Sequence, residues 1–179
     1  MDTSLLENIA EDLVSHRLQQ ANILVAKPKF DVEGTDLLAF LAMADGVKFC
    51  RIQCKGRSLK NGASNISIPK RYVTKGFLVF LYIDSLDYSG DLYCFFAQDI
   101  EKWSLSAQDQ YTLSLSSSTY RENIMAHKFQ PITIELIKIL IQQADATGEF
   151  GYLSVLSGNV NLGDAVASGV FTGYGGSGA

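Results

Sequence analysis

Seven consecutive apolar or aromatic residues, from Phe77 to Ile83, constrain the fold of this chain more than any other feature. A short run of this composition, with no polar residue on either side-chain face, predicts a central β-strand that is buried on both faces. A chain that contains such a strand is expected to build a layered domain around a sheet. The segments on either side of the run supply the other elements.

These segments predict one mixed α/β or α+β domain, with a helix first, then strands, then helices. An apolar stripe predicts a helix from Ser4 to about Gln20, and Ser4 and Glu7 fit its capping box. We predict strands at 23–26, 37–43, 47–55, 66–68 and 92–96, with a hairpin turn at 45–46 and a polar loop at 57–65. The remaining pattern predicts helical turns at 98–103, an edge strand at 111–115 and helices at 119–128 and 131–144.

The chain of 179 residues is long enough for one domain with a sizeable core, which we expect to span residues 1–147. Residues 148–179 hold nine of the fifteen glycines and are predicted to form a flexible C-terminal segment. No apolar run approaches the roughly 18 residues of a membrane span, so no membrane partner is expected. Three cysteines without a CxxC pair favour buried free thiols in a reducing cytoplasm.

Charge is distributed unevenly along the chain. The net charge is −4, but residues 46–83 contain eight basic residues and no acidic residue, so the two flanks sum to −12. A local block of +8 can attract a polyanion even when the whole chain is acidic. A solvated strand face with a lysine-rich loop explains the same block equally well. If the block binds nucleic acid, the candidates for phosphate contact are Arg57, Lys60, Lys70, Arg71 and Lys75.

A small group of polar residues lies where a core would prefer apolar ones. Asp36 begins an apolar strand, and Gln53 and Lys55 share one face of the strand that follows the hairpin. With a tight turn, Asp36 is expected opposite Lys55, while Glu11 lies on the sheet-facing side of the first helix. Carboxylate and amide oxygens are ligands that Mg²⁺ prefers, and a lysine beside such a metal can act on a water or on a phosphorane-like transition state. Taken singly, each residue also fits a turn cap, a solvent face or a helix surface.

The ordered set resembles the restriction-endonuclease-like PD-(D/E)XK nuclease superfamily. The likeness rests on helix residue Glu11, then Gly34-Thr35-Asp36-Leu37-Leu38, then Arg51-Ile52-Gln53-Cys54-Lys55, and it covers roughly residues 4–103. It is closest to the branch with Gln-x-Lys, which includes Holliday-junction-resolvase-like, homing-endonuclease-like and uncharacterised prokaryotic nuclease domains. The resemblance implies an αβββαβ core with a central mixed sheet flanked by helices.

The resemblance also implies a function, namely metal-dependent hydrolysis of phosphodiester bonds in DNA. Asp36, Gln53, Glu11 and the backbone carbonyl of Cys54 would bind Mg²⁺ or Mn²⁺, and Lys55 would assist the attacking water or the transition state. Glu7 is a rival to Glu11, but the capping box is its better use. A homodimer is expected, because cutting both strands usually needs two sites. The alternative is a catalytically inactive domain of the same fold that binds nucleic acid or another protein.

Overall fold

The computed structural model describes residues 3–30, 33–44, 46–60, 62–84, 89–144, 155–156 and 159–160. The chain divides into two compact units, residues 1–147 and 148–179. In the second unit, β9 (Val155–Leu156) pairs antiparallel with β10 (Asn159–Val160). The flexibility predicted for 148–179 concerns residues that lie almost entirely outside the described ones, so it stays a prediction.

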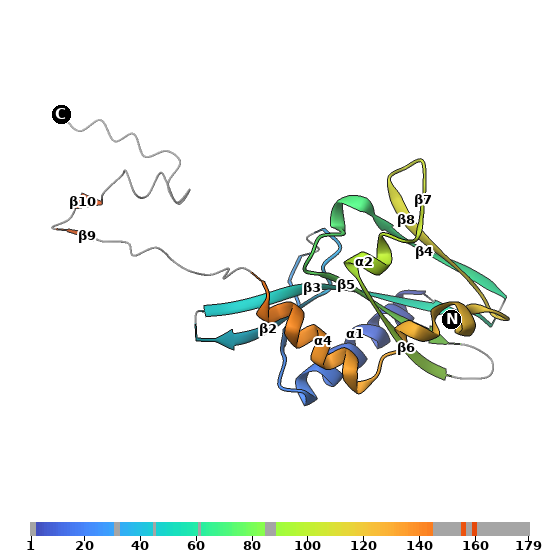
Figure 1. The fold of residues 1–179 in the computed structure, drawn as a ribbon, viewed down its shortest axis with the longest axis horizontal. Helices are drawn as coiled ribbons and strands as arrows, with labels where there is room; N and C mark the ends of the chain where they lie inside the picture. Colours follow the sequence, from blue (N-terminus) through green and yellow to red (C-terminus); the bar gives the residue numbers. More distant parts are fainter. Residues whose placement is uncertain are drawn as a thin grey trace. The chain divides into compact units, whose positions relative to one another are not determined.

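A five-stranded mixed sheet forms the centre of the first unit (Figure 1). Its strand order is β1-β2-β3-β5-β6, and only the β3–β5 pair is parallel. The strands are β1 (Leu24–Ala26), β2 (Leu37–Met43), β3 (Gly46–Ser58), β5 (Phe77–Asp84) and β6 (Ser89–Phe96). The run that opens the sequence analysis therefore forms β5, which has a neighbour on each edge and is buried on both faces.

Two helices supply the core on one face of this sheet. The first, α1 (Thr3–Gln20), buries Leu6, Ala10, Val14 and Leu18, which recur at the spacing of one helical face. The second, α4 (Pro131–Gln142), buries Ile137 and Ile141. These residues share one hydrophobic cluster with Cys50, Ile52 and Cys54 of β3. The cysteines Cys50, Cys54 and Cys94 are free and buried, as predicted.

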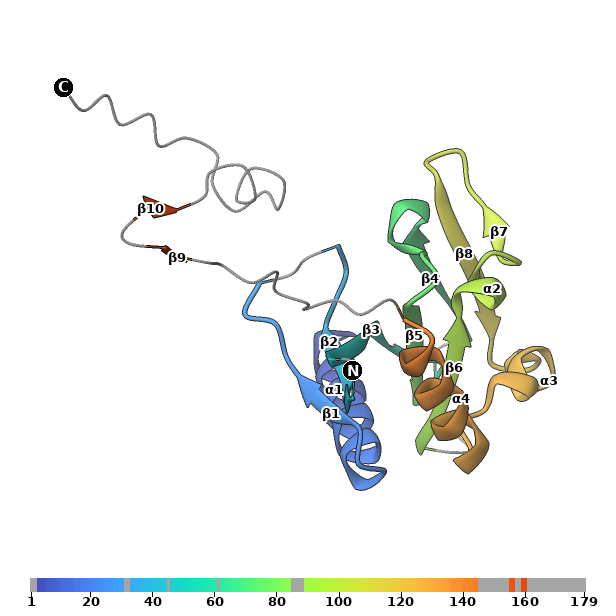
Figure 2. The ribbon, with the colours of Figure 1, turned by 60° about the vertical axis from the view of Figure 1, so that its left-hand side comes forward.

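A second, three-stranded sheet and short helices contribute a separate core on the opposite face (Figure 2). Its order is β4-β8-β7, and it pairs antiparallel throughout. The elements on this side are β4 (Ala63–Pro69), η1 (Lys70–Tyr72), α2 (Ala97–Ile100), β7 (Ser104–Leu105), β8 (Gln110–Ser116), α3 (Tyr120–Ile124) and η2 (Met125–His127). This layer buries the β5 face that carries Phe77, Val79 and Leu81.

The second sheet corrects two predictions. The polar loop predicted at 57–65 is shorter than expected and lies between Ser58 and Ala63, because β3 continues to Ser58 and β4 begins at Ala63. The strand at 111–115 is not an edge strand, because β8 lies between β4 and β7. Polar residues alternate with Ile66 and Ile68 on β4, and this strand pattern buries only one face. The connection from β3 to parallel β5 therefore runs through β4 and η1, where the αβββαβ order places a helix.

The register of the β2–β3 hairpin also differs from the prediction. Leu37 pairs with Ile52 and Met43 with Gly46, so partner numbers sum to 89 instead of 91. Extended by one residue, this register places Asp36 at the level of Gln53, not of Lys55. A shift of two residues keeps every side chain on its predicted face, because side chains alternate with a period of two. Among the described residues, no helix is long and apolar enough to cross a membrane.

Candidate active site

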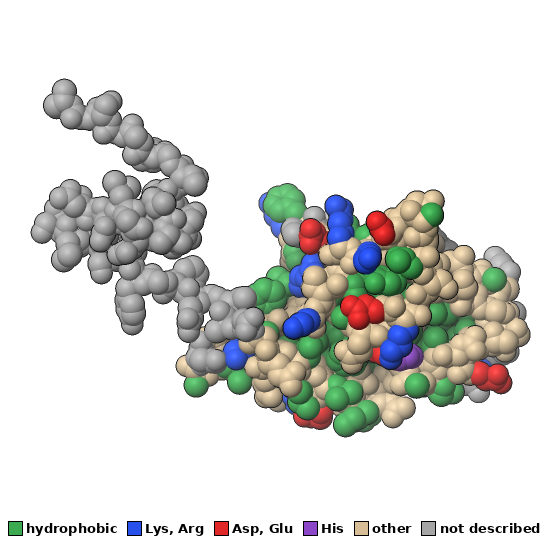
Figure 3. Space-filling view, turned by 45° about the horizontal axis from the view of Figure 1, so that its top comes forward, with side chains coloured by type: hydrophobic (Ala, Val, Ile, Leu, Met, Phe, Trp, Pro, Cys, Tyr) green, Lys and Arg blue, Asp and Glu red, His purple; other side chains and the backbone are tan. Residues whose placement is uncertain are grey.

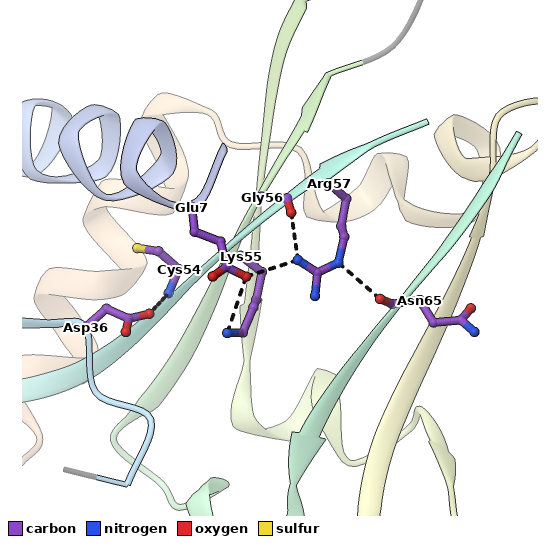
Figure 4. Close-up of polar contacts among 7 residues, drawn as sticks. All are labelled: Glu7, Asp36, Cys54, Lys55, Gly56, Arg57 and Asn65. Atoms are coloured by element: carbon purple, nitrogen blue, oxygen red, sulfur yellow. Dashed lines mark hydrogen bonds and ion pairs between the residues drawn. The ribbon is translucent and has the colours of Figure 1, made fainter. Parts of the chain in front are cut away.

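The candidate site lies where β3 extends beyond the end of β2. The pairing between β2 and β3 ends at Leu37 and Ile52, whereas β3 continues to Ser58. Asp36 follows this edge of β3, since its backbone N–H donates to the Ile52 carbonyl at 2.9 Å. Its side-chain Oδ2 accepts a hydrogen bond from the Cys54 N–H at 2.6 Å (Figure 4). The carboxylate is therefore fixed against the strand that carries Gln53 and Lys55.

The electrostatic environment of Asp36 disfavours its charged form. Burial raises the pKa of Asp36 above its usual value, and this effect outweighs the Cys54 N–H and the Lys55 ammonium, which lower it. The charges of Glu11 and Glu7 raise the pKa of Asp36 further. A half-buried carboxylate beside two other acids is an environment in which a bound cation is stabilising.

Gln53 supplies a second oxygen in the same region. Its side chain is only 7% exposed, and Oε1 has no hydrogen-bond partner among the described residues. An unpaired buried amide oxygen costs free energy, so its presence in a folded site calls for a ligand or a functional role. Gly34, at a φ of +67°, lies so close that a Cβ atom there would be 2.7 Å from Gln53 Nε2 and from the Tyr72 ring. The amide is thus confined by Gly34 and Tyr72.

Lys55 and Arg57 are joined to the first helix through Glu7. Glu7 Oε1 lies 3.6 Å from Lys55 Nζ and 3.0 Å from Arg57 Nη1 (Figure 4). Arg57 also donates to the carbonyls of Gly56 at 2.7 Å and Asn65 at 3.1 Å. Arg57 therefore ties α1, β3 and β4 together. Glu7 therefore contacts two basic side chains of β3, whereas the sequence predicts that it forms a capping box.

Glu11, the predicted helical acid, lies one turn further along α1. It forms an ion pair with Lys27, which is directly before Pro28. Its charge nevertheless acts on Asp36 more strongly than that of Glu7 does. The structure thus divides the two acids, with Glu7 at Lys55 and Glu11 in the electrostatic field of Asp36. The sequence reasoning missed the Glu7–Lys55 contact, although the four-residue spacing of Glu7 and Glu11 places both on one helical face.

The oxygen atoms of the site fit a divalent cation that prefers hard ligands. Asp36 offers a carboxylate and Gln53 an unpaired amide oxygen. Since the N–H and C=O of one strand residue point to the same side, the Cys54 carbonyl faces the edge at which Asp36 binds the Cys54 N–H. Only one of these three ligands is an acid, and the described residues contain no cluster of three His, Cys, Asp or Glu suited to a metal. What these three groups have in common is that each offers an oxygen, the ligand type that Mg²⁺ and Mn²⁺ use together with water and phosphate oxygens.

The predicted phosphate-binding residues separate into two groups. Arg57 is paired with Glu7, and Lys60 lies 2.8 Å from Asp84, so both bases are held by carboxylates. In contrast, Lys70, Arg71 and Lys75 form no ion pair with any residue that the structure describes. Figure 3 shows acidic side chains interspersed among the Lys and Arg side chains of the visible face. The block of +8 is therefore partly neutralised, and its unpaired charge is concentrated in η1 and the turn after it.

Two further residues help to shape this region. Arg51 donates to the Tyr72 carbonyl at 2.9 Å and to Thr74 Oγ1 at 3.0 Å, which fixes η1 beside β3. Arg71 stacks over the Tyr72 ring, with its guanidinium carbon 5.2 Å from the ring centroid. The Tyr72 ring, whose packing against Gly34 we describe above, thus has an exposed arginine on it.

Comparison with known proteins shows which fold this arrangement belongs to. No protein-family profile matches the chain, and neither does any curated protein. Among solved structures, it is similar to a bacterial homing endonuclease, I-Ssp6803I, with a TM-score of 0.53 and 16% identity over 79% of this chain and 96% of that one. A Holliday junction resolvase from Archaeoglobus fulgidus, Hjc, matches with a TM-score of 0.41 and 12% identity over 72% of this chain and 93% of that one. The predicted fold class is confirmed, because the chain has a mixed α/β fold with a five-stranded mixed central sheet flanked by helices, like that homing endonuclease.

Proposed function

We propose that this chain is a metal-dependent nuclease of PD-(D/E)XK type that hydrolyses phosphodiester bonds in DNA. The observation that best supports the proposal is the unpaired Gln53 Oε1, which lies buried on β3 beside the point where Asp36 binds Cys54. The similarity in fold to a homing endonuclease adds support by analogy. The order of the site residues along the chain supports the same assignment.

In this proposal, the Asp36 carboxylate, the Gln53 amide oxygen and the Cys54 carbonyl hold Mg²⁺ or Mn²⁺. When bound, such an ion neutralises phosphate charge and makes its water more acidic. The Lys55 ammonium stabilises the negative charge that develops on the phosphate during attack, or orients the attacking water. Glu7 positions Lys55 by its contact at 3.6 Å, and Glu11 adds negative charge near Asp36.

DNA binding is assigned to the unpaired bases beside the site. Lys70, Arg71 and Lys75 are free to contact phosphates, whereas Arg57 and Lys60 would first have to leave Glu7 and Asp84. The phosphate contacts predicted for Arg57 and Lys60 stay a prediction, and the pairing with Glu7 gives Arg57 a structural role as well. A homodimer would supply two sites for the cleavage of two strands.

The test is a cleavage assay on linear duplex, branched and single-stranded DNA and on RNA, with Mg²⁺, with Mn²⁺ and with chelator. Asp36→Ala and Lys55→Ala are expected to abolish cleavage and to retain DNA binding. Asp12→Ala and Lys102→Ala are matched controls, because both residues are exposed and lie outside the site. Cleavage that needs neither metal nor Asp36 and Lys55 would refute the proposal.

A second candidate is a domain of the same fold that binds nucleic acid without cleaving it. It is favoured by the neutral Gln53 among the proposed ligands and by the lack of a cluster of three acidic or other metal-binding side chains in the described part of the chain. This candidate predicts salt-dependent DNA binding that Mg²⁺ and Asp36→Ala do not change. Gln53→Glu separates the two, since a second carboxylate among the proposed ligands is expected to tighten metal binding only if the site holds a metal.

A further inference from the structure

The outer face of α4 is apolar. Ile132, Leu136 and Ile139 are 60%, 45% and 48% exposed, and their spacing of four and three residues places them on one face of the helix. The opposite face of α4 buries Thr133, Ile137 and Ile141 against the sheet. A surface helix normally presents polar residues to water, so an apolar stripe on its outer face indicates a contact surface.

A small hollow lies beside this stripe. It has a volume of about 130 Å³, and Ile132, Leu136 and Phe96 are among its lining residues. Since a water molecule in the liquid occupies about 30 Å³, the hollow is large enough for a branched aliphatic side chain. The stripe therefore lies beside a depression lined by apolar side chains and also by polar ones, among them His127 and Lys128.

The charges on α4 indicate which partner fits the stripe. Glu135 and Lys138 flank it on one side and pair with each other at 3.0 Å. If a second α4 packs antiparallel about a twofold axis at the level of Leu136, Ile132 lies within one residue of the position opposite the partner's Ile139. Glu135 likewise lies within one residue of the position opposite the partner's Lys138, and the reverse pair forms by symmetry. A surface that is complementary to itself in charge and apolar spacing is what a twofold contact requires.

We propose that α4 is the contact surface of a homodimer, in which the stripes of two copies of this chain pack antiparallel. The proposal goes beyond the nuclease assignment and does not depend on it, because dimerisation is measured without substrate or metal. We expect a contact centred on one helix to bury less than the roughly 1,200–2,000 Å² typical of stable interfaces. The dimer is therefore expected to form at micromolar concentrations of chain.

Sedimentation velocity and light scattering on the full chain test the proposal. At about 50 μM the wild type is expected to have twice the 19.6 kDa mass of one chain. Leu136→Glu is expected to be monomeric at the same concentration, whereas Leu105→Glu stays dimeric. Leu105 is a matched control because it is 51% exposed and lies on β7, in the second sheet. Circular dichroism melting of both variants verifies that they are folded.

Charge reversal tests the antiparallel arrangement. Glu135→Lys and Lys138→Glu each place like charges across the twofold axis, so each is expected to weaken its own homodimer several-fold. An equimolar mixture of the two variants is expected to restore dimers, because opposite charges then face each other. A wild type that is monomeric at 50 μM overturns the proposal, whether the chain's own C-terminal residues or another protein covers the stripe. A Leu136→Glu variant that dimerises as well as Leu105→Glu overturns it too.

Discussion

Replacing Gly56 by alanine tests the packing of α1 against β3, on which the whole site depends. A Cβ atom at Gly56 would lie 2.3 Å from the Leu6 carbonyl carbon and 2.5 Å from Leu6 Cβ. Ordinary van der Waals contact begins near 3.4 Å, so the helix backbone would have to move by about 1.1 Å (3.4 − 2.3). Overpacking in a core costs about 1–3 kcal/mol, and a clash with backbone belongs at the upper end, about 3 kcal/mol.

The assay is urea unfolding followed by circular dichroism. With an m-value of about 2 kcal/mol/M, a loss of about 3 kcal/mol lowers the midpoint by about 1.5 M. The same displacement would lengthen the 3.0 Å contact between Glu7 and Arg57 beyond hydrogen-bonding distance, so cleavage is expected to fall as well. Gly76→Ala is the matched control, since no atom lies within 4 Å of its added Cβ. Equal midpoints for the Gly56 and Gly76 variants would refute the described packing.

Four further substitutions in and around the site give predictions. Burial raises the folded-state pKa of Asp36, so its ionisation opposes folding, and the stability present at low pH is lost as pH rises through that pKa. The free energy of unfolding of Asp36→Asn relative to wild type, measured without metal, should therefore increase between pH 3 and pH 7; a constant difference would contradict this. Arg57→Ala is expected to lower unfolding stability by about 2 kcal/mol, because it removes charged hydrogen bonds to two other elements. Arg71 is exposed, so Arg71→Ala should leave stability unchanged. It should reduce the slope of the logarithm of the DNA-binding constant against the logarithm of salt concentration by about 1. A loss of stability in Arg71→Ala together with a smaller salt slope in Arg57→Ala would contradict these two assignments. Gly34→Ala should destabilise the chain and reduce metal-dependent cleavage, since its Cβ would displace the Gln53 amide; full activity would show that the amide position is unimportant.

Much of the sheet follows from local patterns in the sequence. The β2 strand has its predicted bounds, and the β5 strand extends the predicted run by one residue. These elements could be predicted because hydrophobic periodicity and strand length act within a few residues. The second sheet could not be predicted, because its strands β4 and β8 are separated by nearly fifty residues of sequence and each is only partly apolar. Nothing within either segment reveals its partner.

The candidate site divides in the same way. The residue types and their faces were readable in the sequence, because Gln53 and Lys55 share a strand face whatever the register. The contacts between these residues could not be predicted, because the hairpin register is set by a turn that the sequence allows at more than one position. That register places Asp36 beside Gln53 and the Cys54 N–H. The assignment of Glu7 to Lys55 depends on how closely α1 approaches Gly56, which only packing determines.

The sequence by itself determined the fold class, the positions of the central strands along the chain and the residues from which a site can be built. Tertiary structure decided which of those residues are free to act. Arg57, Lys60, Lys70 and Lys75 are all basic residues of the same segment, and the sequence does not distinguish them. Only Arg57 and Lys60 lie close to carboxylates, those of Glu7 and Asp84. Electrostatic and hydrogen-bonding energies fall steeply with distance, so the availability of a charge depends on neighbours that are remote in sequence and close only after folding.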